Sequence, residues 1–219
     1  MTGTSTVARA RQQKPKAAEG APLGRRERNK LEKQRRIVAA ARRLFAEQGF
    51  AETTTLQIAE AADIGTGTLF LYASSKEDLL LLIFKDEMLE VAHTSLAQVT
   101  PDQSSIDSIM AVFERMVDYH SKDMDLTRIL LREQIIPSND RRQSDVDELV
   151  RVIFRGLAKL IRMGQATGEI ADRLNPKLAA QSCFSIYYFG LLRWLNKRIP
   201  RKQFLMETRR QIAELCNAD

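Results

Sequence analysis

The chain has 219 residues, enough for a sizeable buried core, and its 44% hydrophobic and 28% charged residues are ordinary for a soluble globular protein. The sequence starts without the apolar segment of a signal peptide, and its longest apolar run, residues 79–84, is too short to span a bilayer. We therefore expect a cytoplasmic protein with no membrane partner.

The net charge of +6 is concentrated at the start of the chain. Residues 1–36 hold eleven Lys and Arg against three Glu, a charge of +8, which leaves −2 for the remainder. A basic end on a nearly neutral body indicates a polyanionic partner. Residues 1–27 lack apolar periodicity and are predicted to be a disordered basic tail, so a merely solvated leader is the alternative interpretation.

Two helices are predicted next. From Arg28, apolar residues recur at helical spacing until Gly49, which predicts a first helix with a glycine stop. Thr54 followed three residues later by Gln57 is a capping box and predicts the start of a short second helix.

A third short helix is predicted over residues 66–73, after a tight turn at residues 63–65. Two short helices joined by a glycine-containing turn form a helix-turn-helix, here at residues 55–74. We therefore expect a three-helix DNA-binding domain over residues 28–75.

The third helix is expected to bury Ile64, Leu69 and Ala73. The residues then left toward solvent are Thr66, Gly67, Thr68, Phe70 and Tyr72. Threonine hydroxyls and methyls suit base edges and phosphates in the DNA major groove. Gly67 costs a helix about 1 kcal/mol relative to alanine, so close approach to a ligand is the expected compensation. Lys76, at the start of the next helix, carries a charge that suits a phosphate.

Residues 58–79, IAEAADIGTGTLFLYASSKEDL, resemble the signature of the tetracycline-repressor (TetR) family. Its members join a helix-turn-helix head to a helical ligand-binding and dimerisation body, and the likeness covers residues 33–80. It implies base-reading positions at Thr66, Gly67 and Thr68, and phosphate positions at Thr55, Tyr72 and Lys76. Two positions depart from the family pattern: Phe70 replaces a frequent tyrosine and loses its hydroxyl, and Ala73 replaces a large aromatic.

The rest of the chain, residues 76–219, shows helical periodicity throughout and no internal repeat, which predicts an all-α fold with an effector-binding and dimerisation domain. The expected helices cover 76–98, 103–121, 124–134, 141–166, 177–197 and 202–217.

Residues 177–197 are apolar nearly all round, so this helix should be buried on two faces. One face can meet the body's own core, and the other, with the last helix, can meet the same pair in a second subunit. The expected homodimer interface comprises Tyr188, Leu191, Leu195, Phe204, Leu205, Thr208, Ile212 and Leu215. A monomeric core is the alternative.

A candidate effector pocket is suggested by methionines and aromatics on otherwise aliphatic helix faces. Its expected members are Phe113, Met116, His120, Met124, Phe154 and Phe184. Each alone is more often plain core, and His120 alone is more often a satisfied or partly exposed histidine. As a group they suit a small lipophilic molecule with one polar anchor.

No catalytic motif is visible: the chain has two histidines and no HExxH, GxSxG or paired-carboxylate pattern, so we expect no enzyme, cofactor or metal. Cys183 and Cys216 lack CxxC spacing, which predicts buried free thiols. The sequence thus predicts a ligand-responsive repressor, a homodimer that binds double-stranded DNA at a palindromic operator in the nucleoid. The alternatives are an architectural DNA-binding protein without effector control and a helical binding module without DNA binding.

Overall fold

The computed structural model describes residues 24–100, 103–135 and 140–217, with the backbone alone at 133–135 and 140–142. Within these ranges the chain forms helices and no strand, which confirms the predicted all-α fold. The helices are α1 (Arg25–Glu52), α2 (Thr55–Ala61), α3 (Thr66–Leu69), α4 (Lys76–Ala97), α5 (Ser105–Ser121), α6 (Met124–Ile135), α7 (Asp140–Ala166), α8 (Pro176–Leu195) and α9 (Arg201–Cys216).

The helix ends in the head differ from the prediction in three places. Helix α1 begins at Arg25, inside the expected tail, whose residues 1–23 lie outside the described ranges. It runs to Glu52 but is kinked at Gly49, where φ is 83°, a conformation that glycine adopts without Cβ strain. Helix α3 ends at Leu69 and is followed by turns, so it is shorter than expected.

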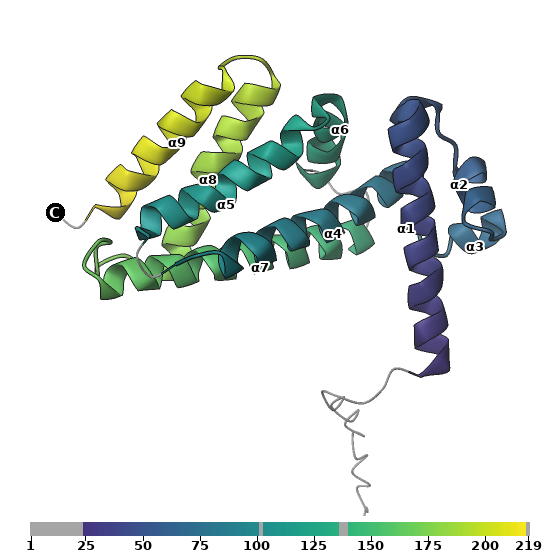
Figure 1. Cartoon of the computed structure of the whole chain (residues 1–219), viewed down its shortest axis with the longest axis horizontal. Helices are drawn as coiled ribbons and strands as arrows, with labels where there is room; N and C mark the ends of the chain where they lie inside the picture. Colours follow the sequence, from purple (N-terminus) through teal and green to yellow (C-terminus); the bar gives the residue numbers. More distant parts are fainter. Residues whose placement is uncertain (1–23, 101–102, 136–139, 218–219) are drawn as a thin grey trace, which may run out of the picture.

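The head packs α1 across α2 and α3 at one end of the molecule (Figure 1). Its buried side chains include Ile37, Ile58 and Leu69, each less than 2% exposed and each worth about 1.5–3 kcal/mol of burial. The predicted capping box is present: the Gln57 amide donates to Thr54 Oγ1 at 3.2 Å, and the Thr54 amide donates to Gln57 Oε1 at 2.8 Å.

Arg36 ties α1 to the turn between α2 and α3. Its Nε donates to the Ala62 carbonyl at 3.0 Å, and its Nη2 lies 3.0 Å from the Asp63 carboxylate. Arg36 belongs to the basic segment at the start of the chain, but it has a structural role, because it donates to the carbonyl of Ala62, the residue that caps the end of α2.

Helix α4 belongs to both the head and the body, since its start packs on α1 and its length packs on α5 and α7 (Figure 1). The division of the chain at residue 76 therefore stays a prediction. Among the described residues, three ion pairs hold α4: Arg42 of α1 lies 3.0 Å from Glu87, and Lys85 lies 2.8 Å from Asp145 and 2.5 Å from Glu148, both of α7. Burial lowers the pKa of Lys85, but hydrogen bonds and charge attraction to Asp145 and Glu148 together outweigh burial and raise this pKa.

Helices α8 and α9 form the far end of the body and cross closely at Gly190. A Cβ added there would lie 2.4 Å from Cε2 of Phe204, so only glycine permits this approach. Cys183 and Cys216 are buried and free, as predicted. None of the described helices is long and apolar enough to cross a membrane.

Candidate functional site

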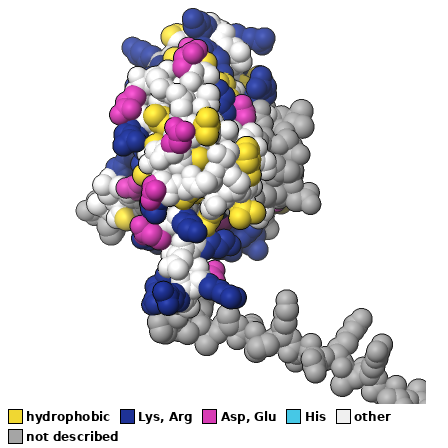
Figure 2. All heavy atoms as spheres, turned by 90° about the vertical axis from the view of Figure 1, so that its right-hand side faces the viewer, with side chains coloured by type: hydrophobic (Ala, Val, Ile, Leu, Met, Phe, Trp, Pro, Cys, Tyr) yellow, Lys and Arg dark blue, Asp and Glu magenta, His cyan; other side chains and the backbone are white. Residues whose placement is uncertain are grey.

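The outer side of α2 and α3 exposes the residues expected to read DNA. Gly67 is exposed, Thr55, Thr66 and Thr68 are half-buried, and Phe70 is 49% exposed. Figure 2 views this side and shows exposed hydrophobic side chains within it and Lys and Arg around it. We call Thr66, Gly67 and Thr68 the recognition face.

Tyr72 does not point to solvent as predicted. It is 8% exposed, whereas Leu71, which the sequence pattern did not single out, is 77% exposed. The cause is the early end of α3: the amides of Tyr72 and Ala73 both donate to the Leu69 carbonyl, at 2.8 and 3.0 Å, and this turn directs Tyr72 inward. Little of Tyr72 therefore remains for the phosphate contact.

Gly67 is not required by the fold itself. Among the described residues, a Cβ added to it would meet no heavy atom within 4 Å beyond its chain neighbours and the backbone of its own helix. Since alanine would stabilise a helix more than glycine by about 1 kcal/mol, the folded chain alone gives no reason for glycine at this place.

Lys76 already has partners in the free protein. Its Nζ donates to the carbonyls of Phe50 and Ala51 at 2.8 Å and of Thr53 at 3.3 Å, and it lies 4.6 Å from the centre of the Phe50 ring. A cation at the end of α1 interacts favourably with the helix dipole. Lys76 thus caps α1, and its predicted phosphate contact would have to share or replace these bonds.

The first turns of α1 project beyond the rest of the head (Figure 1). Residues 24–33 are all exposed and carry five Lys and Arg against two Glu. No ion pair joins these cations to any described carboxylate. Figure 2 shows Lys and Arg on both sides of these first turns of α1, so positive charge lies beside the head.

The body encloses a cavity of about 30 Å³, here called the core cavity, between α4, α5, α6, α7 and α8. Three predicted pocket residues line it: Met116, His120 and Phe184. This volume holds about one water molecule, so a larger ligand requires the surrounding helices to move.

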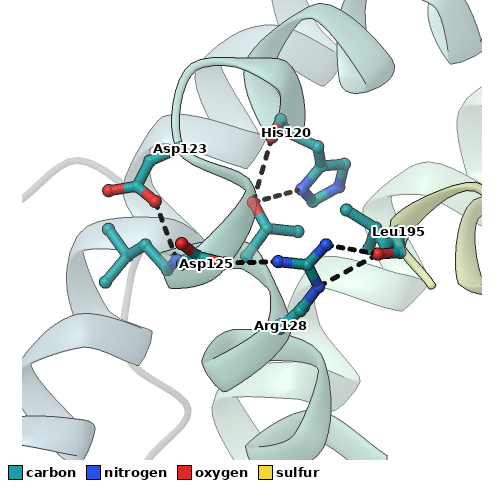
Figure 3. Close-up of polar contacts among 7 residues, drawn as sticks. His120, Asp123, Asp125, Arg128 and Leu195 are labelled. Atoms are coloured by element: carbon teal, nitrogen blue, oxygen red, sulfur yellow. Dashed lines mark hydrogen bonds and ion pairs between the residues drawn. The ribbon is translucent and has the colours of Figure 1, made fainter. Parts of the chain in front are cut away.

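His120 contributes a neutral polar group to the core cavity. It is 2% exposed, and burial lowers the pKa of its imidazole to about 4. The Thr127 hydroxyl donates to the His120 carbonyl at 3.3 Å and lies 3.5 Å from Nδ1, which is a weak contact (Figure 3). Beside it, Arg128 donates from Nε to the Leu195 carbonyl at 3.0 Å and so fastens α6 to the end of α8.

Tyr187 also lines the core cavity, although sequence reasoning missed it. The residue is fully buried, its hydroxyl has no hydrogen-bond partner, and burial raises its pKa. An unpaired buried hydroxyl costs about 1–3 kcal/mol, which a bound acceptor would recover. In the apolar sequence of α8 this tyrosine resembles an ordinary core aromatic, and only the cavity distinguishes it.

The other predicted pocket residues lie elsewhere. Phe113 stacks on Tyr187 with ring centres 4.5 Å apart and lies behind the cavity wall in closed core. Met124 is half-buried outside the lining, and Phe154 faces an outer groove. The six residues therefore do not form one pocket, because helical spacing does not distinguish the inner wall from the layer behind it.

The predicted dimer residues are mostly core of the single chain. Five of them are buried within their own subunit: Leu191, Leu195, Phe204, Thr208 and Ile212. Tyr188, Leu205 and Leu215 are partly exposed. The large apolar side chains exposed on α8 and α9 are instead Leu178, Phe189 and Met206, at 62%, 65% and 62%.

Residues 37–83 match the family model described as bacterial regulatory proteins, tetR family. The fatty acid metabolism regulator protein of Bacillus subtilis is 24% identical over 166 residues, which cover 76% of this chain and 85% of that protein. The HTH-type transcriptional regulator TtgR of Pseudomonas putida is 28% identical over 172 residues, 73% of this chain and 78% of that protein.

Two solved structures share the fold. Thermus thermophilus FadR, a TetR-family repressor in complex with lauroyl-CoA, superposes with a TM-score of 0.71 at 21% identity and covers 85% of this chain and 96% of its own. Bacillus subtilis FadR in complex with stearoyl-CoA superposes with a TM-score of 0.59 at 22% identity, and the match covers 84% of this chain and 98% of that protein.

Proposed function

We propose that this chain is a DNA-binding transcriptional regulator of the tetR type, because residues 37–83 match that family model and similar proteins over most of its length are regulators. It acts in this proposal as a homodimeric repressor of a palindromic operator in the cytoplasm. A lipophilic effector that enters the body would release the DNA. Gly67 is the observation that supports DNA reading. The fold does not require a glycine at this position, whereas close approach of the backbone to a base would.

The recognition face is proposed to read bases, because two half-buried threonines flank an exposed glycine whose Cβ position is open. Thr68→Ala should lower affinity for the cognate site by about 1–3 kcal/mol and leave non-specific binding nearly unchanged. Thr94→Ala, which removes an exposed threonine from α4 in the body, is the matched control.

Selection of bound fragments from random DNA tests the operator itself. We expect one inverted repeat, with half-sites spaced by a helical turn or a multiple of it. Recovery of no enriched sequence would contradict a specific repressor and favour the architectural alternative.

The exposed start of α1 is proposed to hold phosphates beside the recognition face. Arg26, Arg28 and Lys30 are exposed and form no ion pair with a carboxylate of the described residues. Their joint replacement by alanine should weaken binding on all DNA sequences and make the salt dependence shallower, since each lost phosphate contact releases one counterion fewer. An unchanged salt dependence would show that this segment is only solvated.

The homodimer is proposed to form through the outer face of α8 and α9, where Leu178, Phe189 and Met206 are exposed. Two-fold pairing would bury these side chains in a four-helix contact and present two recognition faces. Phe189→Lys should yield a monomer in analytical ultracentrifugation, whereas Met163→Lys, which alters an exposed apolar residue of α7, should not. A dimeric Phe189→Lys protein would place the interface elsewhere.

The effector is proposed to be a long acyl chain, because two relatives of the same fold are described in complex with lauroyl-CoA and stearoyl-CoA. The apolar core cavity, with the unpaired Tyr187 hydroxyl and neutral His120, suits such a chain with one acceptor atom. The cavity must open, and Lys85 links the α7 wall to α4 and thus to the head.

Linkage gives the test of effector control. An acyl ligand that favours the DNA-incompetent state must raise Tm and lower operator affinity together, and coupling of about 1–3 kcal/mol suffices for a switch. Tyr187→Phe should weaken ligand binding without destabilising the free protein, since the hydroxyl has no partner there. If the Tyr187→Phe protein bound the ligand with unchanged affinity, the Tyr187 hydroxyl would not contact the ligand.

A further inference from the structure

A groove of about 530 Å³ lies on the outside of the body between α7 and α8. Its apolar floor contains Val150, Phe154 and Ala158. Its rim carries the four cations Arg151, Arg155, Arg162 and Lys177. We call the three floor residues and these four cations together the cationic groove.

Among the described residues, the cations that line the groove outnumber the carboxylates that line it by four to one. No ion pair joins any of the four cations to a carboxylate within the part of the chain that the structure describes. Asp147 is the one acid among the residues that line the groove, against four cations. Arg151 and Arg162 are separated by about 16 Å along the helix axis, at 1.5 Å per residue.

This charge pattern selects the kind of ligand. Guanidinium groups bind phosphate through two parallel hydrogen bonds, and four cations, three on α7 and one on α8, exceed what a single carboxylate can neutralise. An apolar floor beneath them favours a ligand that also carries hydrocarbon.

Only a thin wall separates the cationic groove from the core cavity. Val150 lines both spaces. Phe154 of the groove packs edge to face against Phe184 of the cavity, with ring centres 5.5 Å apart and planes at 74°. Both rings are half-buried, so their rotation would connect the two spaces without breaking a polar contact.

We propose that the cationic groove and the core cavity are the two halves of one site for an amphiphile with an apolar chain and a polyphosphate head, such as a fatty acyl-CoA. The chain passes between Phe154 and Phe184 into the core cavity, whose walls move apart to admit it, and the phosphates bind the four cations of the groove. This inference rests on the proposed effector control and adds where each part of the effector binds.

The test measures binding of lauroyl-CoA, laurate and coenzyme A to the full-length protein by calorimetry. The wild type should bind lauroyl-CoA more tightly than either part. Replacement of Arg151, Arg155 and Arg162 by Gln should weaken lauroyl-CoA binding by at least about tenfold, or 1.4 kcal/mol, and leave laurate binding unchanged. It should also reduce the salt dependence of lauroyl-CoA binding.

The matched control replaces three other exposed cations, which lie away from α7, by Gln: Lys197, Arg198 and Lys202. Its lauroyl-CoA affinity should equal that of the wild type, although the same charge is lost. Melting curves check that both triple variants fold. If the groove variant does not fold, the single variant Arg155→Gln is measured in its place.

Three outcomes would overturn the proposal: wild-type affinity for lauroyl-CoA in the groove variant, an equal loss in the control variant, or no binding of lauroyl-CoA to the wild type. Operator binding without ligand is measured in parallel and should be the same in all variants. If it persists while lauroyl-CoA fails to bind, this inference fails and the DNA-binding proposal stands.

Discussion

The buried His120 makes the stability of this protein dependent on pH in a defined window. Burial lowers the pKa of its imidazole to about 4 from the ordinary 6.5, because the charged form loses its hydration. In the unfolded chain the same imidazole is hydrated and takes up a proton as the pH falls through 6.5. The unfolded state thus binds more protons between pH 6.5 and 4, and the free energy of unfolding falls as the pH falls through this range.

The size of the effect follows from the two pKa values. A difference of about 2.5 pH units, at 1.36 kcal/mol per unit, corresponds to about 3 kcal/mol of stability that is present above pH 6.5 and lost at pH 4. The free energy of unfolding of a domain is about 5–15 kcal/mol, so the protonation of this one imidazole would remove a substantial part of it.

The assay is urea unfolding followed by circular dichroism at several values between pH 7.5 and 4. Because carboxylates also titrate near pH 4, the informative quantity is the difference between the wild type and His120→Leu, which cannot take up the proton. The exposed His93 offers the control, and His93→Gln should keep the wild-type pH dependence. If His120→Leu lost stability with falling pH as steeply as the wild type, the burial argument would be refuted.

Three further substitutions test how the helices pack. Gly190→Ala should lower the free energy of unfolding by about 1–3 kcal/mol in urea titrations, because its Cβ would overlap the buried Phe204 ring; unchanged stability would show that the ring yields easily. Lys76→Met should lower the melting temperature even without DNA, since three carbonyls lose their donor; a loss of DNA affinity alone would mean that the cap contributes nothing. Gly67→Ala should raise stability by up to about 1 kcal/mol and weaken operator binding, and a variant that bound the operator normally would exclude close approach at this position.

The amino-acid sequence by itself predicted the elements that depend on neighbouring residues. The Thr54–Gln57 capping box and the ends of the body helices, each within two residues, follow from contacts spanning a few residues, whereas the stop predicted at Gly49 is a kink in a helix that continues to Glu52. Turn chemistry and helical periodicity likewise placed the helix-turn-helix. These features are local because hydrogen bonds within a helix or turn join residues close together in the chain.

Tertiary structure alone decided which surfaces remain available. Lys76 meets carbonyls 23 to 26 residues away, and Leu71 replaces Tyr72 outside because α3 ends one turn early. Helix α8 is apolar all round, so its sequence could not distinguish Leu191, in the core, from Phe189, in solvent. The cationic groove requires α7 and α8 to lie side by side. Periodicity predicts that a face is buried, but the partner that buries it is set by packing between helices distant in the chain.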